Sequence, residues 1–424
     1  MLTRNQIIII GVIGFIALFF ILIFLGVIPG LKKTQQGGQQ LQLNFWGVEE
    51  ETALRPIFDS YQSANGVRIN YTKFSENNFE KNLIDALASG KGPDILAFHS
   101  SWLPKHIGKI APAPTAANFS ITQIRNLYPQ IIENDFVKDN KIYALPVYID
   151  TLALIYNRDF FDAKGVAVVP KSWAEFQSVI PALKETDALG RITKAAAAIG
   201  GSEKSIDRAS DLLTLLMFQF SINLNVENSE KVAFSKDKKS IQALNFYLQF
   251  ADSSNQAYAW NDNLRYSLDN FSQGTVAAIF NYSSAISQIK SKNPFLNIGV
   301  APMPQISKDS VNYANYWGLA VSNQSKQQAA AWNFILYLSS NQLVAEQYLK
   351  ASKRPPALRS LIQKYSNDSD SGVFSNQALT AKSWKQKDNE SIRKIFSNMI
   401  ESVLSGGIDS QKALQQAENE INSL

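Results

Sequence analysis

Apolar and polar positions follow a regular order from residue 41 onward. The segment "LQLNFWG" (residues 41–47) alternates apolar and polar residues, which is typical of a strand with one buried face. "ETALRPIFDSYQSANG" (51–66) then carries apolar residues at helical spacing, "VRINYTKF" (67–74) indicates a second strand, and another helical stripe covers 79–87. The continuous apolar run "ILAF" (95–98) indicates a buried parallel strand. The pattern therefore predicts the order strand, helix, strand, helix, strand.

Aromatic residues stand where two of these strands end. Trp46 closes the first strand, and Phe98 and Trp102 lie at and just beyond the end of the third. In open parallel sheets this edge is where ligands bind. Flat apolar rings suit the C–H surfaces of sugars, while polar neighbours accept and donate hydrogen bonds. The alternative is that all three are ordinary core aromatics.

The N-terminal segment is strongly apolar. Ile7 to Ile28 forms 22 residues without a charge, against about 20 needed to span a bilayer as a helix. We expect residues 1–33 to be an uncleaved single-pass membrane anchor, with a cleaved signal peptide as the alternative. The Gln- and Gly-rich residues 34–40 predict a flexible linker.

Length, charge and cysteine content narrow the class of protein. A chain of 424 residues is long enough for two lobes. The formal net charge is +5, but Arg4, Lys32 and Lys33 flank the apolar segment, so no basic stripe remains and we expect no nucleic-acid partner. The absence of cysteine excludes disulfides, thiolate catalysis and cysteine zinc sites.

Catalytic and metal-binding motifs are not evident. His99 and His106 fit no metal-ligand spacing, and the sequence contains no nucleophile elbow, zinc-protease motif or phosphate loop. Glu49 and Asp150 are conceivable as a glycosidase pair, although carboxylates in sugar sites are commonly plain acceptors. We expect no catalytic residue, no metal and no cofactor.

Three segments have the form of interlobe connections. "YALPVYIDTLALIYN" (143–157) is apolar on both sides of Asp150, so it indicates two strands joined almost without a loop. "TVAAIFNYSS" (275–284) and "NYWGLAVS" (315–322) repeat this arrangement. Short crossings of this kind act as hinges between rigid lobes.

Two local signals fix helices further along the chain. Ser172 and Glu175 have the spacing of a capping box, which predicts a helix start before "WAEFQ". Residues 329–350 and 410–424 are amphipathic and are expected to be packing helices.

Taken in order, several segments resemble the extracellular solute-binding proteins of the maltose-binding type, the substrate receptors of ABC importers. The resemblance runs from about Leu41 to the C-terminus. Five segments carry it: "SGKGPDILAF" (89–98), "DNKIYALPVYIDTLALIYNRDFF" (139–161), "PKSWAEFQSVIPALK" (170–184), "FSQGTVAAIFNYSSAI" (271–286) and "NIGVAPMP" (297–304).

The resemblance implies an α/β, two-lobe periplasmic-binding-protein-like fold of type II. Each lobe would be a mixed sheet flanked by helices, and the three crossings would connect them. The N-terminal lobe would comprise residues 41–150 plus 281–322. The C-terminal lobe would comprise residues 151–280 plus 323–424.

The resemblance also implies a ligand site, carried over by position. Ser101 and Trp102 stand where the maltose receptor has an acid and an arginine, which argues against maltose itself. The glutamate after the first strand has a second interpretation, because acids at a helix N-terminus are favoured by the helix dipole. The implied ligand-binding residues are Trp46, Glu49, Phe98, Ser101, Trp102, Asp150, Tyr282, Trp317 and Trp384.

These expectations combine into a function. The protein would be a monomeric, membrane-tethered receptor whose extracytoplasmic body captures a carbohydrate, specifically an oligosaccharide, and delivers it to ABC permease subunits. The alternatives are a ligand-sensing module for a signalling partner and a receptor for a polyamine or a phosphate ester. A basic cleft would favour phosphate esters, and an acidic one would favour cations.

Overall fold

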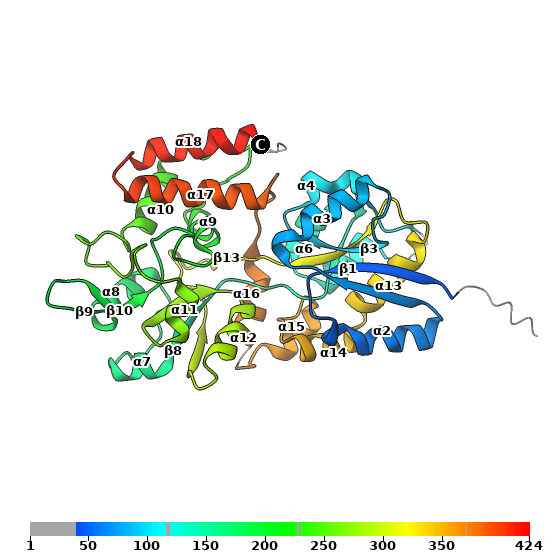
Figure 1. The fold of residues 1–424 in the computed structure, drawn as a ribbon, viewed down its shortest axis with the longest axis horizontal. Helices are drawn as coiled ribbons and strands as arrows, with labels where there is room; N and C mark the ends of the chain where they lie inside the picture. Colours follow the sequence, from blue (N-terminus) through cyan, green and yellow to red (C-terminus); the bar gives the residue numbers. More distant parts are fainter. Residues whose placement is uncertain (1–39, 116–118, 227–228, 230, 370) are drawn as a thin grey trace, which may run out of the picture.

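The computed structural model describes residues 40–115, 119–226, 229, 231–369 and 371–424. These residues form two α/β lobes, which lie on the right and left of Figure 1. In the described part of the chain, no helix is both long enough and apolar enough to cross a membrane. The expected anchor, residues 1–33, and most of the expected linker lie outside the described residues.

The first lobe is built on a sheet with the strand order β2-β1-β3-β14-β4, and β7 also pairs with β14. The pairs β1–β2 and β1–β3 are parallel, whereas β14 is antiparallel to β3. The strands are β1 (Gln42–Gly47), β2 (Arg68–Lys73), β3 (Ile95–His99), β4 (Ile110–Ala111), β7 (Leu145–Pro146) and β14 (Trp317–Ser322).

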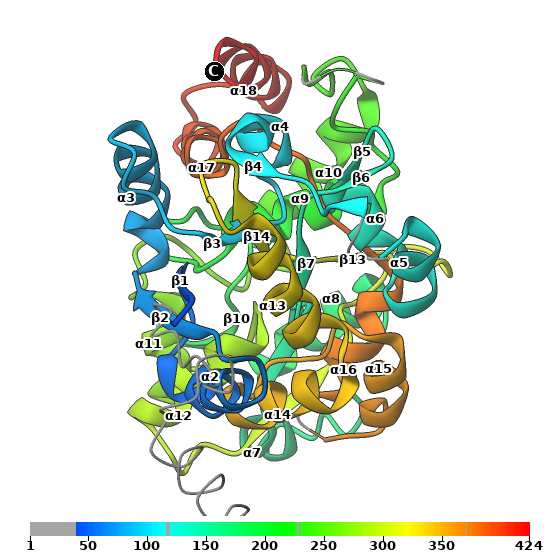
Figure 2. The same cartoon turned by 90° about the vertical axis from the view of Figure 1, so that its right-hand side faces the viewer.

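Helices cover both faces of this sheet. Helix α2 buries Leu54, Ile57 and Phe58 and ends at Gly66, whose left-handed φ of 69° suits glycine. Figure 2 shows α13 in front of the sheet and α14 beside α2. The helices are α2 (Glu51–Asn65), α3 (Glu76–Ala88), α4 (Leu103–His106), α5 (Ile121–Leu127), α6 (Gln130–Phe136), α13 (Gln328–Ser340), α14 (Gln342–Ser352) and α15 (Arg359–Tyr365).

The second lobe has a sheet with the order β12-β8-β11-β10-β9. The predicted capping box is confirmed, because the Ser172 hydroxyl accepts from the Glu175 backbone N–H and the Glu175 carboxylate accepts from that of Ser172. The strands are β8 (Ala153–Asn157), β9 (Glu185–Thr186), β10 (Ile192–Ala197), β11 (Val276–Asn281) and β12 (Ile298–Ala301). The helices are α7 (Arg158–Ala163), α8 (Trp173–Leu183), α9 (Ala209–Gln219), α10 (Lys238–Leu248), α11 (Ser267–Ser272), α12 (Ser283–Lys292), α17 (Asn389–Leu404) and α18 (Ser410–Ser423).

Two of the expected lobe assignments are wrong in part, although β14 does lie in the first lobe and α17 and α18 do lie in the second. Residues 281–322 were expected in the first lobe, but β12 pairs with β8, and α12 buries Ala285 and Ile289 in the core of the second lobe. Residues 323–424 were expected in the second lobe, yet α13 buries Trp332 in the core of the first. Contacts with distant parts of the chain determine where both segments lie. Strand β12 forms the edge of the second-lobe sheet, and α13 covers one face of the first-lobe sheet. The segment after β11 therefore does not cross between the lobes.

Three segments do cross, and they lie side by side. Thr151 forms an antiparallel bridge with Ala314, and the Asn315 N–H donates to the Asp150 carbonyl at 3.0 Å. Strand β13 (Asn312–Tyr313) pairs in parallel with β15 (Ala381–Lys382), which follows α16 (Gly372–Gln377). All three crossings are short, so rotation of the lobes would be concentrated there.

A buried charge cluster fixes this hinge. Asp150 accepts hydrogen bonds from the N–H of Ser283 (3.0 Å) and from its hydroxyl (2.7 Å) at the start of α12. The Arg354 guanidinium lies 3.5 Å from Asp150 and donates twice to Glu49, at 2.9 and 3.3 Å. Burial raises the pKa of Asp150, whereas Arg354 and the Ser283 hydrogen bonds oppose that rise. One guanidinium therefore contacts the loop after β1 and the hinge, and Asp150 connects it to the start of α12 in the second lobe.

Replacing Arg354 with alanine leaves two carboxylates near the hinge without their shared cation. We expect the free energy of unfolding to fall by about 3 to 5 kcal/mol, measured by chemical denaturation. Arg55→Ala is the matched control, because it removes an exposed pair with Glu51 and should cost less than about 1 kcal/mol. Equal, small losses for the two variants would show that the cluster does not stabilise the hinge.

Candidate functional site

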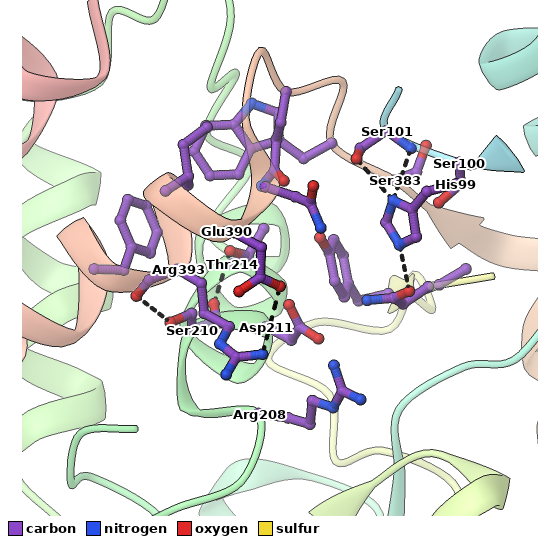
Figure 3. A pocket seen from close by; sticks show the side chains of 18 residues that line it. His99, Ser100, Ser101, Arg208, Ser210, Asp211, Thr214, Ser383, Glu390 and Arg393 are labelled. Carbon is purple, nitrogen blue, oxygen red and sulfur yellow. Dashed lines mark hydrogen bonds and ion pairs between the residues drawn. The ribbon is translucent and has the colours of Figure 1, made fainter. Parts of the chain in front are cut away.

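Two adjoining cavities lie between the lobes and beside the crossing segments, and we call them together the cleft. Their empty volumes are about 520 and 700 Å³. Figure 3 shows the first cavity from close by. Six residues line both cavities: His99, Arg208, Asn315, Asn389, Glu390 and Arg393.

Both lobes and one crossing contribute to the cleft. The first lobe provides the carboxyl end of β3 and the start of α3, the second provides the starts of α9 and α17, and Asn315 comes from the crossing before β14. Strand ends and helix starts meet here because parallel strands present their carboxyl ends at one edge. A ligand in the cleft would therefore touch both lobes.

His99 is held as a neutral hydrogen-bonding group. Its Nε2 lies 2.7 Å from Asn315 Oδ1, and its Nδ1 accepts from the Ser101 N–H at 3.3 Å and lies 2.8 Å from the Ser101 hydroxyl. The amide oxygen can only accept, so we assign the ring hydrogen to Nε2. Burial lowers the pKa of His99. This neutral ring orients the polar groups of Asn315 and Ser101 at the wall of the cleft.

Aromatic rings form one wall of the larger cavity. Trp317 is half-buried and makes edge-to-face contacts with three rings. The distances between ring centroids are 5.6 Å to Phe79, 5.0 Å to His99 and 5.1 Å to Trp102. Trp102 is only 3% exposed and lies parallel to Phe79 at 6.0 Å. Its Nε1 donates to Asn389 of the second lobe at 3.1 Å. Trp317 therefore offers the more accessible ring, and Trp102 supports it.

The second lobe contributes charged groups of both signs to the cleft. Arg208 precedes α9, and its Nε lies 3.9 Å from Asp207 Oδ2. Arg393 on α17 lies 3.6 Å from Glu203 and 3.9 Å from Glu390. These separations are too long for hydrogen bonds, so the acids compensate the charge without occupying the guanidinium N–H groups.

The structure places four of the nine expected site residues in the cleft wall. Ser101 and Trp384 line the first cavity, and Trp102 and Trp317 line the second. The Trp384 ring is buried, and its Nε1 donates to Asn225 at 2.5 Å. Ligand binding by these four residues stays a prediction.

The other five residues lie away from the cleft wall. Phe98 is a fully buried core residue, and Trp46 packs on a neighbouring phenylalanine outside both cavities. Glu49 and Asp150 belong to the hinge cluster, where the same arginine contacts both, so the geometry does not favour a glycosidase pair. Tyr282 lies beneath the floor, because its hydroxyl donates to an aspartate of α9 at 2.8 Å. A strand end therefore places a residue near the site without exposing its side chain.

Several cleft residues were not predicted from the sequence. Arg208, Asn389 and Arg393 belong to no motif, and Asn315 was expected only as part of a crossing segment. Position in the chain could have indicated Arg208. Residues 198–208 follow the carboxyl end of β10, which is parallel to β11, and ligands bind beyond such strand ends. Among the residues that the structure describes, no group of three His, Asp or Glu side chains could hold a metal ion.

A separate buried acid links the first lobe to the crossing beside the cleft. Asp135 on α6 accepts hydrogen bonds from the Tyr316 hydroxyl at 2.5 Å and from the Ser383 hydroxyl. Burial raises the pKa of Asp135 to about 7, although both hydrogen bonds oppose the rise. The protonation of this group is therefore coupled to the packing of the crossing segments.

The two mixed α/β lobes, their three crossings and the cleft between them define the two-lobe fold of a solute-binding protein. The sequence profile for bacterial extracellular solute-binding proteins matches residues 57–374. The chain therefore belongs to this family, whose members are extracellular binding proteins. The resemblance drawn from its sequence motifs is confirmed.

Individual relatives are distant in sequence but similar in fold. A binding protein of Brucella abortus (strain 2308) is 20% identical over 384 residues, covering 85% of this chain and 88% of its own. The sugar-binding protein MalE from Xanthomonas citri has a TM-score of 0.76 at 20% identity, covering 90% and 96% of the two chains. An ABC substrate-binding protein from Listeria monocytogenes, in complex with cycloalternan, has a TM-score of 0.75 at 18% identity, covering 91% and 99%.

We expect Asp135→Asn to remove a pH dependence of stability. Because the pKa of Asp135 is about 7 in the folded state and about 3.9 in an unfolded chain, the folded state binds more protons between these values. The wild-type protein should therefore lose stability as pH rises from 5 to 8, and the asparagine variant should gain on the order of 2 kcal/mol relative to it. Denaturant unfolding at several pH values measures this difference. Asp59→Asn, at an exposed position, is the control, and a pH-independent difference for Asp135→Asn would contradict the expectation.

Proposed function

We propose that this protein is a membrane-tethered extracytoplasmic receptor that captures an uncharged carbohydrate, specifically an oligosaccharide, and delivers it to an ABC permease. The observation that carries the proposal is the composition of the cleft, where a half-buried tryptophan ring and hydrogen-bonding groups of balanced charge line the same cavity. Sugars need this combination, because each ring has an apolar C–H face and a belt of hydroxyls.

The charge balance supports a sugar over the alternative solutes. Three cations line the cleft, Arg208, Arg393 and Lys81, and four acids line it, Asp211, Glu390, Glu76 and Glu80. Glu80 is already paired with the side chains of α4. A polyamine site would need an excess of acids and a phosphate-ester site an excess of cations, and the cleft has neither.

Capture would proceed by a shift between open and closed arrangements of the lobes. A ligand that contacts both lobes binds the closed arrangement more tightly and therefore increases its population. Lys105 of the first lobe contacts Asp388 of the second at 2.9 Å, and Trp102 contacts Asn389. These contacts lie at the rim of the cleft, where they would form only on closure.

Different observations support the membrane tether and the delivery of the solute to a permease. The apolar residues 7–28 have the length of a membrane span. The family is extracellular, and a similarly folded protein from Thermotoga lettingae is an ABC transporter solute-binding protein bound with tagatose (TM-score 0.73, 18% identity, covering 90% of this chain and 99% of that one). A body held at the outer surface would present the captured solute to a permease without diffusing away.

Fractionation of cells tests the anchor. The intact protein should sediment with membranes, and a variant lacking residues 1–39 behind a cleavable export signal should be released from the membrane fraction. Mature wild-type protein beginning near Gln35 in the soluble fraction would show that the segment is cleaved instead.

A ligand screen tests the binding function. Residues 40–424 should show a raised melting temperature with one of maltotetraose, mannobiose, tagatose or cycloalternan, because a ligand that binds only the folded state stabilises it.

Trp317→Ala should then weaken calorimetric affinity about 5- to 150-fold, equivalent to roughly 1 to 3 kcal/mol of lost ring contact. Trp173→Ala is the matched control in the core of the second lobe, where about 3 to 5 kcal/mol of stability should be lost instead. Stabilisation by a polyamine or a phosphate ester alone would overturn the proposal.

A further inference from the structure

Arg208 has a backbone conformation that its residue type does not favour. Its φ of 67° and ψ of 27° lie in the left-handed region, directly before α9, and its side chain makes no capping hydrogen bond. For a residue with a Cβ this conformation costs roughly 1 to 2 kcal/mol, so glycine or asparagine would be expected here. Within the described chain five residues other than glycine have a positive φ, and Arg208 is the one that lines the cleft.

The guanidinium of Arg208 also lacks a hydrogen-bond acceptor at Nε. This atom is buried and has no partner among the described residues. The side chain as a whole keeps 26% exposure, and Figure 3 shows it beside the cavity with no hydrogen bond to the residues drawn. An unsatisfied buried donor costs about 1 to 3 kcal/mol, so a second unfavourable feature coincides with the first.

The surroundings of Arg208 keep it charged but leave its donors free. Burial would lower its pKa, yet Asp207 and Asp211 outweigh this effect and raise it. Each of these acids accepts a hydrogen bond from a neutral tyrosine, Asp207 from Tyr266 at 2.9 Å and Asp211 from Tyr282 at 2.8 Å. The Tyr282 ring also lies 5.4 Å from the guanidinium carbon. The group is thus a planar, charge-compensated donor held in place by its neighbours.

We infer that Arg208 is the specificity-determining residue of the cleft, where its guanidinium donates hydrogen bonds to adjacent hydroxyls of an uncharged sugar. The inference rests on the proposed function, and it adds which chemical group of the ligand the cleft recognises, namely a pair of adjacent hydroxyls. Two parallel N–H groups match two neighbouring oxygen atoms, which a lysine cannot do. Free guanidinium donors also suit a carboxylate, but Asp211 and Glu390 line the same cavity and would repel it, so we expect the site to prefer uncharged sugars to uronates.

Arg208→Gly separates this role from a structural one. Glycine relieves the left-handed strain and removes the unsatisfied donor, which offsets the loss of the positive charge beside Asp207 and Asp211, so the melting temperature without ligand should change little. Affinity for the stabilising sugar of the screen should fall at least 10-fold by calorimetry. Lys353→Gly is the matched control, because Lys353 has a φ of 60° outside the cleft, and its replacement should leave the affinity unchanged.

Two further measurements sharpen the test. Arg208→Lys keeps the charge but loses the paired donors, so it should also weaken binding at least 10-fold. Wild-type protein should bind glucose or mannose at least 10-fold more tightly than glucuronate or mannuronate in competition with the screened sugar.

The failure of the inference and that of the proposed function give different results. If the wild-type protein binds a sugar and Arg208→Gly binds it equally well, the inference is overturned and the receptor function stands. A lower melting temperature with unchanged affinity would assign Arg208 a structural role, and tighter binding of the uronates would overturn the selection for uncharged sugars. If the wild-type protein binds no sugar, the proposed function itself is overturned.

Discussion

The arrangement of both lobes depends on the buried contact of Arg354 with Glu49 and Asp150. Removing three charged groups from water is costly, and it is offset here by a double hydrogen bond to Glu49 and by the Ser283 hydrogen bonds to Asp150. The partners belong to different parts of the fold, namely the loop after β1 for Glu49, the hinge for Asp150 and the start of α12 for Ser283. The cluster thereby fixes where the first crossing leaves one sheet and where α12 begins on the other, so the axis of lobe rotation is defined by specific contacts.

A fixed axis allows the two walls of the cleft to be specialised. The first lobe contributes rings that support one another, with Trp317 resting on Phe79 and Trp102. The second lobe contributes guanidinium groups on two helix starts. In the proposed receptor the most accessible ring would come from the first lobe and the guanidinium groups from the second, so a bound sugar would need both lobes for its full set of contacts. Ligand recognition and closure would then be one process, because the complete set of contacts exists only in the closed arrangement.

Local parts of the fold were predictable from the sequence, but long-range placement was not. Alternation identified β1, and the Ser172 capping box identified the start of α8, since both signals lie within a few residues. The pairing of β12 with β8 and the docking of Trp332 depend on partners distant in the chain, so the lobe boundaries were misassigned. In the cleft, position after a strand indicated the region of Trp102. It could not show that Trp102 would be buried and Trp317 accessible, because that difference arises from packing.

Arg208 shows why a departure from local preference can carry information about function. Asp139 and Asn140 also have positive φ values, but they form the tight turn between β5 (Val137–Lys138) and β6 (Lys141–Ile142), and their side chains tolerate that conformation. No turn chemistry explains an arginine before α9. The strain persists because the surrounding core of the second lobe determines the backbone there, and it coincides with an unsatisfied donor in a cleft of balanced charge. Two independent costs at one side chain that lines a cavity are expected where the side chain is held in place for function and not for stability.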